Sequence, residues 1–347
     1  MPAEKKISAG QLMLMLFLAR IMHTMIFRAS HSASGAAMML GLLCSTAVEA
    51  VIAIPAVWYF SAGGSDPIRE ISGKFSTAVR LLYSGYFAVI AGGTVALFAE
   101  FLSSEFSNVA PPAAAIILLI LAAAYCACLG IEGLARAATV VFWMFVLLFG
   151  LMAAVNEGGF DWLNLRPFTA EDAGSFSDYF FESLSSGWWL PMFCVLAGHL
   201  KKGAVGAAYG YLVLKLLILE TLLLLVTIVL WRYVDVIGYP IFALGAYAKT
   251  DFIERFDAIN MLVWAINCTL VVGIYLFICS GSLKKPKPAA ILFAIAAAVF
   301  GIFEYKNGLR FDQPWFLGFK LAGVALLGVV LPSAAAVKLL IKRSAER

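Results

Sequence analysis

The sequence predicts an all-α polytopic membrane protein, and three observations support that fold class. Hydrophobic residues make up 63% of the 347 residues and charged residues only 13%, whereas about a quarter of an average soluble domain is charged. The mean hydropathy is +0.93. The apolar residues also form runs long enough for helices to cross a bilayer, which takes roughly 20 residues.

Ten apolar runs predict ten transmembrane helices. The sixth run is short and interrupted, and the ninth needs flanking residues to cross the hydrocarbon. In chain order the runs cover about 8–27, 36–60, 78–100, 112–129, 134–155, 183–199, 204–231, 257–280, 288–303 and 316–341.

The charges between the runs predict the orientation in the membrane. With the N-terminus in the cytoplasm, fifteen Lys and Arg residues fall in inside segments and seven in outside segments, and three lie within or at the edge of spans. Positive residues gather on the cytoplasmic side of membrane proteins. We therefore expect both termini in the cytoplasm and an even number of spans. The net charge of +4 reflects this topology, and we expect no nucleic-acid partner.

An acidic outer loop at about 156–182 divides the spans five and five. Many transporters consist of two inverted repeats, and broken helices near the bilayer midplane hold the substrate. We therefore expect a single integral membrane domain over 1–347, with repeats at about 8–155 and 183–341 and with helices one and six broken. The two halves show no visible sequence identity, so this 5+5 inverted repeat is a structural inference.

The sixth run carries stronger signs of an interruption than the first. A glycine followed by a proline inside a short apolar run is typical of a broken helix. The first run lacks a glycine between Gln11 and Phe27 and instead carries Arg20, His23 and Thr24. The sixth run contains Ser185-Ser186-Gly187-Trp188-Trp189-Leu190-Pro191.

A charged segment at 239–264 lies between the seventh and eighth runs. Asp251 stands three residues before Glu254, which is the spacing of a capping pair at a helix start. Asp251 and Arg255 are four apart and can pair across one turn. The pattern predicts a helix that begins outside the hydrocarbon and enters it at about Met261. The alternative is that the segment only sets the angle of the following span.

Four motifs in order resemble one known family. Their order and positions match the B-subunit family of spore germinant receptors, also called endospore germination permeases, in the amino acid-polyamine-organocation transporter superfamily. With the ten-span layout, this resemblance covers essentially the whole chain. The motifs are Lys6-Ile7-Ser8-x-x-Gln11, then Gly130-Ile131-Glu132-Gly133-Leu134-Ala135-Arg136, then Asn164-Leu165-Arg166-Pro167, and finally Tyr239-Pro240 with Phe252, Glu254-Arg255, Asp257 and Trp264.

The chain departs from the family pattern at two places, and both lie where a ligand would bind. The family commonly has a glycine near the middle of span one, where this chain has Arg20 and His23. It often has a polar or acidic residue near the start of span six, where this chain has Trp188 and Trp189. These tryptophans either line or block the expected cavity.

Ionisable residues inside a bilayer are costly and therefore suggest function. Arg20 and Glu49 each lie about 13 residues into their spans from opposite sides, so at 1.5 Å per residue their depths nearly match. We expect these two residues to form an ion pair, with ligand binding by Arg20 as the alternative. His23 shares a helix face with Arg20 and is either a hydrogen-bonded core residue or a proton sensor.

Lys215 and Glu220 in span seven are five residues apart and do not share a face well. Each is expected to need a partner on another helix, although Lys215 has the alternative of extending toward the nearer membrane surface. Glu100 is expected at the outer interface.

The resemblance implies a small nutrient ligand at the midplane between spans one, three, six and eight, with an amino acid as the first candidate. Free backbone N–H groups at the helix breaks would bind its carboxylate, and carbonyls or hydroxyls its ammonium group. Gly92 and Gly93 predict close helix packing. By family analogy they also line the cavity, and Trp264 and Asn267 line it as well. The ligand-binding candidates are Arg20, His23, Thr24, Gly92, Gly93, Ser185, Ser186, Gly187, Trp188, Trp264 and Asn267.

The resemblance further implies a B-type subunit that senses a nutrient in the spore inner membrane and triggers germination. It would work with a larger A-type membrane subunit and a C-type lipoprotein. The alternatives are a secondary amino-acid permease coupled to H⁺ or Na⁺, and a structural subunit that has lost ligand binding. The sequence has no nucleophile–His–acid arrangement or phosphate loop, and its six cysteines lie in apolar runs. We expect no enzymatic activity, cofactor or metal.

Overall fold

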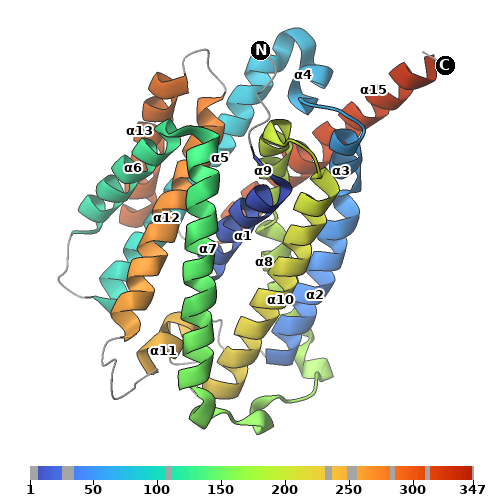
Figure 1. Ribbon diagram of the computed structural model, residues 1–347. Helices are drawn as coiled ribbons and strands as arrows, with labels where there is room; N and C mark the ends of the chain where they lie inside the picture. Colours follow the sequence, from blue (N-terminus) through green and yellow to red (C-terminus); the bar gives the residue numbers. More distant parts are fainter. Residues whose placement is uncertain are drawn as a thin grey trace.

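The computed structural model describes residues 7–25, 35–106, 111–230, 237–247, 256–281, 286–308 and 313–345, and its regular elements are helices (Figure 1). Short 3-10 turns connect several of them. The α-helices are α1 (Ala9–Met25), α2 (Gly35–Ile52), α3 (Ile54–Ser61), α4 (Pro67–Ser72), α5 (Ser76–Glu105), α6 (Pro112–Cys128), α7 (Gly130–Val155), α8 (Ala173–Ser185), α9 (Trp189–Leu196), α10 (Ala204–Leu230), α11 (Pro240–Tyr247), α12 (Phe256–Ser280), α13 (Pro286–Lys306), α14 (Pro314–Gly323) and α15 (Leu331–Ala345).

Seven of the described helical segments are long and apolar enough to cross a membrane. Two shorter apolar helices, α1 and α6, have 17 residues each. Helix α9 lies within the predicted sixth run, whereas α8 overlaps that run only at its C-terminal end and otherwise occupies part of the predicted outer loop at about 156–182. The all-helical membrane class is therefore confirmed. The count of ten spans and the internal repeat remain predictions.

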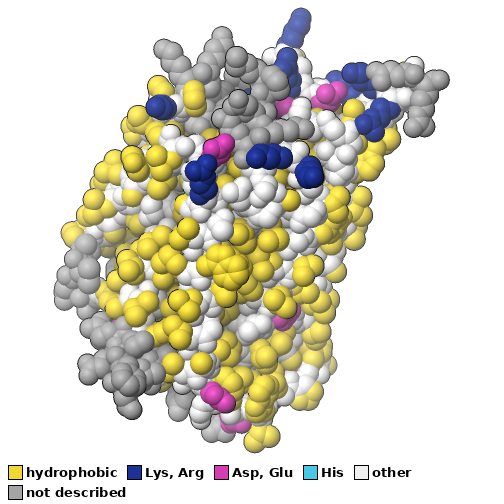
Figure 2. Space-filling model, viewed as in Figure 1, with side chains coloured by type: hydrophobic (Ala, Val, Ile, Leu, Met, Phe, Trp, Pro, Cys, Tyr) yellow, Lys and Arg dark blue, Asp and Glu magenta, His cyan; other side chains and the backbone are white. Residues whose placement is uncertain are grey.

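A belt of apolar side chains covers the middle of the bundle, as Figure 2 shows. Large hydrophobic residues such as Leu118 on α6, Leu147 on α7 and Val299 on α13 are exposed. In the same view, Lys and Arg side chains gather toward the end of the bundle that holds α4. An apolar belt with charge at one end is the surface expected of a membrane-spanning bundle.

Elements far apart in sequence meet at the end of the bundle that holds α4. The Ile7 N–H donates to the carbonyl of His199 at 3.2 Å, and the Lys201 N–H donates to the carbonyl of Ile7 at 3.1 Å. The start of α4 is fixed locally, because the Asp66 side chain accepts from the Arg69 N–H at 3.1 Å and Pro67 occupies the first turn. The opposite end of the bundle holds α11 (Figure 1).

The expected break in the first span is wrong within α1, which is a continuous helix from Ala9 to Met25. The residues that replace the family glycine are compatible with a helix, so the backbone keeps its i→i−4 hydrogen bonds through Arg20 and His23. The expected break in the sixth span is confirmed, because α8 ends at Ser185 and α9 starts at Trp189.

Two further irregularities lie in other spans. A turn at Ala53 separates α2 from α3, next to Pro55, which has no N–H to donate. The last span contains a π-helical segment, η7 (Val324–Val330), between α14 and α15. A Cβ atom on Gly328 of η7 would lie 2.8 Å from Cδ of Pro191 on α9. The π-helix therefore packs directly against α9, just beyond the break.

A turn at Gly130, the first residue of one of the four motifs, lies between the fourth and fifth apolar runs. Helix α6 ends at Cys128 and α7 starts at Gly130, whose φ of 80° is a conformation that glycine adopts at little cost. The predicted helix start at Asp251 lies outside the described residues, and α12 is described from Phe256.

Candidate ligand-binding site

The break between α8 and α9 is built from serine side chains and a glycine. The hydroxyls of Ser185 and Ser186 donate to the carbonyl of Glu182 at 2.7 and 3.1 Å, and the Ser186 N–H donates to the same carbonyl at 3.0 Å. The Gly187 N–H donates to the carbonyl of Leu184 at 3.0 Å. Serine hydroxyls compete with the helical pattern in this way at helix ends. The hydroxyls that were expected to bind an ammonium group therefore also terminate α8.

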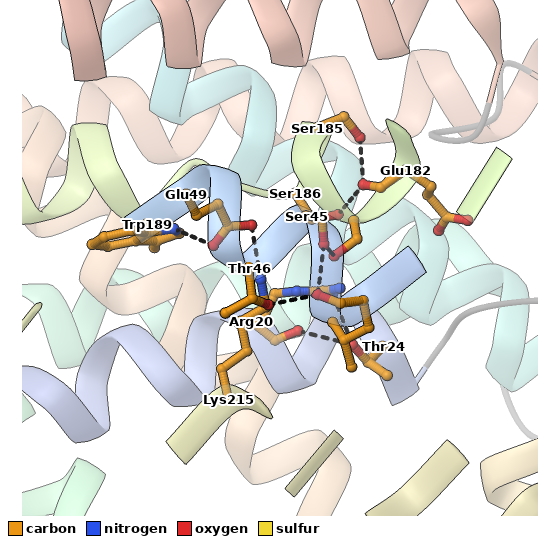
Figure 3. A network of polar contacts seen from close by, with 12 residues as sticks. Arg20, Thr24, Ser45, Thr46, Glu49, Glu182, Ser185, Ser186, Trp189 and Lys215 are labelled. Atoms are coloured by element: carbon orange, nitrogen blue, oxygen red, sulfur yellow. Dashed lines mark hydrogen bonds and ion pairs between the residues drawn. The ribbon is translucent and has the colours of Figure 1, made fainter. Parts of the chain in front are cut away.

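A buried ion pair stands beside the break. Glu49 of α2 accepts from Lys215 Nζ of α10 at 2.8 Å through Oε1 and from Trp189 Nε1 of α9 at 2.8 Å through Oε2 (Figure 3). The Glu49 and Lys215 side chains are 1% and 0% exposed. Three helices thus meet at one carboxylate, and both of its oxygens have a donor, which a buried carboxylate requires.

The expected ion pair between Arg20 and Glu49 is wrong. Similar depth in the membrane allowed the pair, but α2 is packed against α10, and Lys215 reaches Glu49 from there. The prediction that Lys215 needs a partner on another helix is confirmed, and its alternative of extending to the membrane surface is wrong. For Glu220, Oε2 has no hydrogen-bond partner among the described residues.

Arg20 lies close to this pair and is 5% exposed. Its NH1 donates to Thr24 Oγ1 at 2.7 Å, and the Thr24 hydroxyl turns back to the Arg20 carbonyl at 3.4 Å. Among the described residues, Arg20 Nε has no hydrogen-bond partner, and no carboxylate lies within ion-pair distance of the guanidinium. Lys215, rather than Arg20, therefore pairs with Glu49.

His23 lies on the same face of α1 as Arg20 and contacts residues on both sides of the α8–α9 break. Its ring lies edge-on to the Trp188 ring with centroids 5.1 Å apart, and its Nε2 lies 3.8 Å from Glu182 Oε1. The Trp188 indole donates to the Tyr275 hydroxyl of α12 at 2.9 Å. The structure thus brings together the candidates of α1 and those of the break.

Four other candidates lie in different surroundings. A Cβ on Gly92 of α5 would meet the Ala297 carbonyl of α13 at 2.7 Å, so Gly92 serves helix packing, and its neighbour Gly93 is also buried. The Trp264 ring lies tilted against the Phe101 ring, with centroids 5.1 Å apart. Asn267 Nδ2 donates to the Leu18 carbonyl of α1 at 3.3 Å, which places Asn267 against the first helix.

The motif residues hold helix ends. Glu132 and Arg136 form an exposed pair at 3.4 Å in the first turns of α7. Asn164 Nδ2 donates to the Ile228 carbonyl at 3.4 Å near the end of α10, and Tyr239 lies edge-on to Phe101 at 5.0 Å. Pro167 is exposed and Pro240 begins α11. Glu254 and Arg255 lie outside the described residues.

Sequence reasoning missed several polar residues of the interior. Trp189 and Tyr275 donate to or accept from partners 140 and 87 positions away, and no local pattern indicates such contacts. Lys320 on α14, which the sequence analysis counted only among the three basic residues within or at the edge of spans, and Glu304 on α13 are each 1% exposed. For these two a signal existed, since an ionisable residue within an apolar helix is unusual by itself.

Comparisons with known proteins bear on the family and the fold. The sequence pattern of a family described as spore germination protein matches residues 6–307. The chain is similar to Spore germination protein A2 of Bacillus subtilis (strain 168), with 23% identity over 286 residues that make up 78% of this chain and 77% of that protein. Its fold is similar to a Na⁺-coupled sialic acid symporter solved in a substrate-bound outward-open state. The TM-score is 0.58 at 13% identity, covering 98% of this chain and 90% of the symporter chain.

Proposed function

Because this chain belongs to the spore germination protein family, we propose that it is the B-type membrane subunit of a nutrient-germinant receptor. It would sense a small nutrient in the spore inner membrane, with an amino acid as the first candidate. The symporter-like fold supports a protein that holds a small solute within the bilayer. Fold alone does not distinguish sensing from transport, so the proposal depends on the site.

The single observation that carries the proposal is the buried guanidinium of Arg20. It has no carboxylate partner among the described residues and lies on the helix face that reaches the α8–α9 break through His23. An uncompensated buried charge is costly, and a guanidinium matches a carboxylate with two parallel hydrogen bonds. A nutrient carboxylate bound at Arg20 would supply the missing charge. Here Arg20 would take the role that the sequence analysis gave to free backbone N–H groups at the helix breaks.

Ligand binding would act on the break. The α9 helix contacts the π-helical segment η7 through Pro191 and Gly328, and π-helical turns often occur at functional sites. A ligand held between α1 and the break would favour one arrangement of α9 and η7, and its differential affinity sets the size of the shift. Such a change would be read by an A-type membrane subunit and a C-type lipoprotein.

The first experiment compares germination of spores with and without this chain on amino acids, sugars and nucleosides. We expect loss of the response to one nutrient, restored by the wild-type chain. Normal germination on every nutrient would contradict the proposal.

A second experiment tests Arg20 directly. In Arg20→Gln spores, we expect the nutrient concentration for half-maximal germination to rise roughly ten- to a hundredfold, because a hydrogen bond to a charged group contributes about 1.5–3 kcal/mol. Arg136→Gln, at an exposed pair, is the matched control and should respond like wild type. An unchanged response in Arg20→Gln would exclude the carboxylate role, even if the chain is needed for germination.

A secondary amino-acid permease coupled to H⁺ or Na⁺ is the second candidate, and one cavity favours it. A cavity of about 530 Å³ lies at the α4 end of the bundle and reaches Cys194 on α9. Asp66 and Arg80, which form an ion pair, are part of its lining. Such a cavity offers a route between one membrane face and the region beyond the break.

Reconstituted vesicles distinguish the two functions. Uptake of radiolabelled nutrient by the isolated chain, driven by a proton or Na⁺ gradient, would favour the permease. Binding without uptake, together with a requirement for partner subunits in germination, would favour the receptor.

A further inference from the structure

Glu304 is a carboxyl group buried in the membrane part of the protein. It is 1% exposed, and neither Oε1 nor Oε2 has a hydrogen-bond partner among the described residues. It belongs to α13, one of the helices long and apolar enough to cross a membrane. A carboxylate ion without donors is strongly disfavoured in such surroundings, and a neutral carboxyl group is tolerated much better.

Among the described residues, the charged groups that act on the Glu304 carboxyl are Glu100 on α5 and Lys320 on α14. Of the other helices packed against α13, α6 contains no Asp, Glu, His, Lys or Arg, and α12 contains only Asp257 in its first turn. The ring contact of Phe300 with Phe316 joins α13 to α14. Lys320 is therefore the described cation placed to compensate an ionised Glu304.

The path toward the α4 end of the bundle is closed next to Glu304. A Cβ on Gly301 would lie 2.9 Å from the Gly92 carbonyl, and one on Gly92 would lie 2.7 Å from the Ala297 carbonyl. Helices α5 and α13 thus touch backbone to backbone less than one turn from Glu304. Glu304 stands two residues before the end of α13 at Lys306. The path from its carboxyl group to water is therefore shortest at that end.

We propose that Glu304 is a proton-binding site, separate from the Arg20 region, that holds a neutral carboxyl group and exchanges its proton at the Lys306 end of α13. On release, the O–H bond breaks, the proton passes to water, and the carboxylate left behind is compensated by the Lys320 ammonium. A proton fits better than a metal ion, because hard cations need several oxygen ligands and the Lys320 charge repels them. This proposal does not depend on the nutrient site.

The test uses the full-length protein in lipid vesicles and the apolar reagent dicyclohexylcarbodiimide, which adds to protonated carboxyl groups. Modified residues are identified by mass spectrometry, with exposed Glu132 as internal reference. Because the reagent adds to the neutral form of a carboxyl group, we expect modification at Glu304 to exceed that at Glu132 by roughly tenfold or more. Modification should fall as pH rises and should not change when Na⁺ replaces K⁺.

Two outcomes of this labelling experiment would overturn the proposal. The first is modification of Glu132 without modification of Glu304, which would mean that Glu304 is ionised. The second is protection of Glu304 by Na⁺ at constant pH, which would identify a metal-ion site.

Infrared spectroscopy provides an independent test with matched variants. We expect the carbonyl band of a neutral buried carboxyl to be lost in Glu304→Gln and kept in Glu100→Gln, with thermal unfolding used to confirm that both variants fold. Loss of the band in Glu100→Gln alone would place the proton on Glu100 and overturn the assignment. The labelling of the wild-type protein does not depend on either variant.

Discussion

Two glutamate–cation pairs in this molecule have similar chemistry and opposite surroundings. Glu49 and Lys215 are 1% and 0% exposed, lie on α2 and α10 and are 2.8 Å apart. Glu132 and Arg136 are 48% and 76% exposed, lie one turn apart on α7 and are 3.4 Å apart. In water, screening and side-chain entropy leave such a pair with little net effect. In the interior, each charge depends on its partner, so breaking the pair is costly even where forming it gains little.

The largest effect is expected from breaking the buried pair. Lys215→Met should lower the free energy of unfolding by about 3 kcal/mol, because it leaves the Glu49 carboxylate with only the Trp189 N–H. Unfolding in mild detergent measures the loss. The double variant Glu49→Gln with Lys215→Met should recover at least half of it. Additive losses in the double variant would show that the two charges do not depend on each other.

The close contact between α13 and α5 at Gly301 involves no charge and can be compared with the buried ion pair. Gly301→Val should cost about 1–3 kcal/mol, because its side chain meets the Gly92 carbonyl, 2.9 Å from the added Cβ. Gly150→Ala on α7 is the matched control, since no atom lies within 4 Å of its added Cβ. That variant should be neutral or slightly stabilising by helix propensity. Equal losses in both variants would argue against close contact between α5 and α13.

The two adjacent tryptophans donate to different kinds of acceptor, so their variants compare a hydrogen bond to a charged group with one to a neutral group. Trp189→Phe removes the donor to the Glu49 carboxylate and should cost about 1.5–3 kcal/mol. Trp188→Phe removes the donor to the Tyr275 hydroxyl and should cost about 1 kcal/mol. Both keep an aromatic ring, so loss of packing is similar in the two variants. A larger loss in Trp188→Phe would contradict the idea that the buried charge governs the stability of this region.

The smallest effect is expected at the exposed pair. Glu132→Gln should change the free energy of unfolding by at most about 0.5 kcal/mol, and the change should shrink further in high salt. The same detergent unfolding measurement applies. A loss close to that of Lys215→Met would mean that Glu132 has a role beyond its pairing with Arg136.

The chemistry of individual helices could be read from the sequence. Apolar run length predicted the membrane helices, and the Gly187 to Pro191 pattern predicted the break between α8 and α9. These features depend on residues close together in the chain. The break expected in helix one rested on analogy with transporters that are built from two inverted repeats. The helix-forming residues around Arg20 keep α1 continuous.

Partner choice among buried charges was decided only by the tertiary structure. The sequence gives the depth of Arg20, Glu49 and Lys215 in the membrane, because rise per residue is fixed. It does not give which helices are neighbours, and the packing of α10 on α2 joined Lys215, rather than Arg20, to Glu49. The physical reason is that composition and periodicity act within one helix, whereas a buried ion pair needs two helices at one rotation and one spacing.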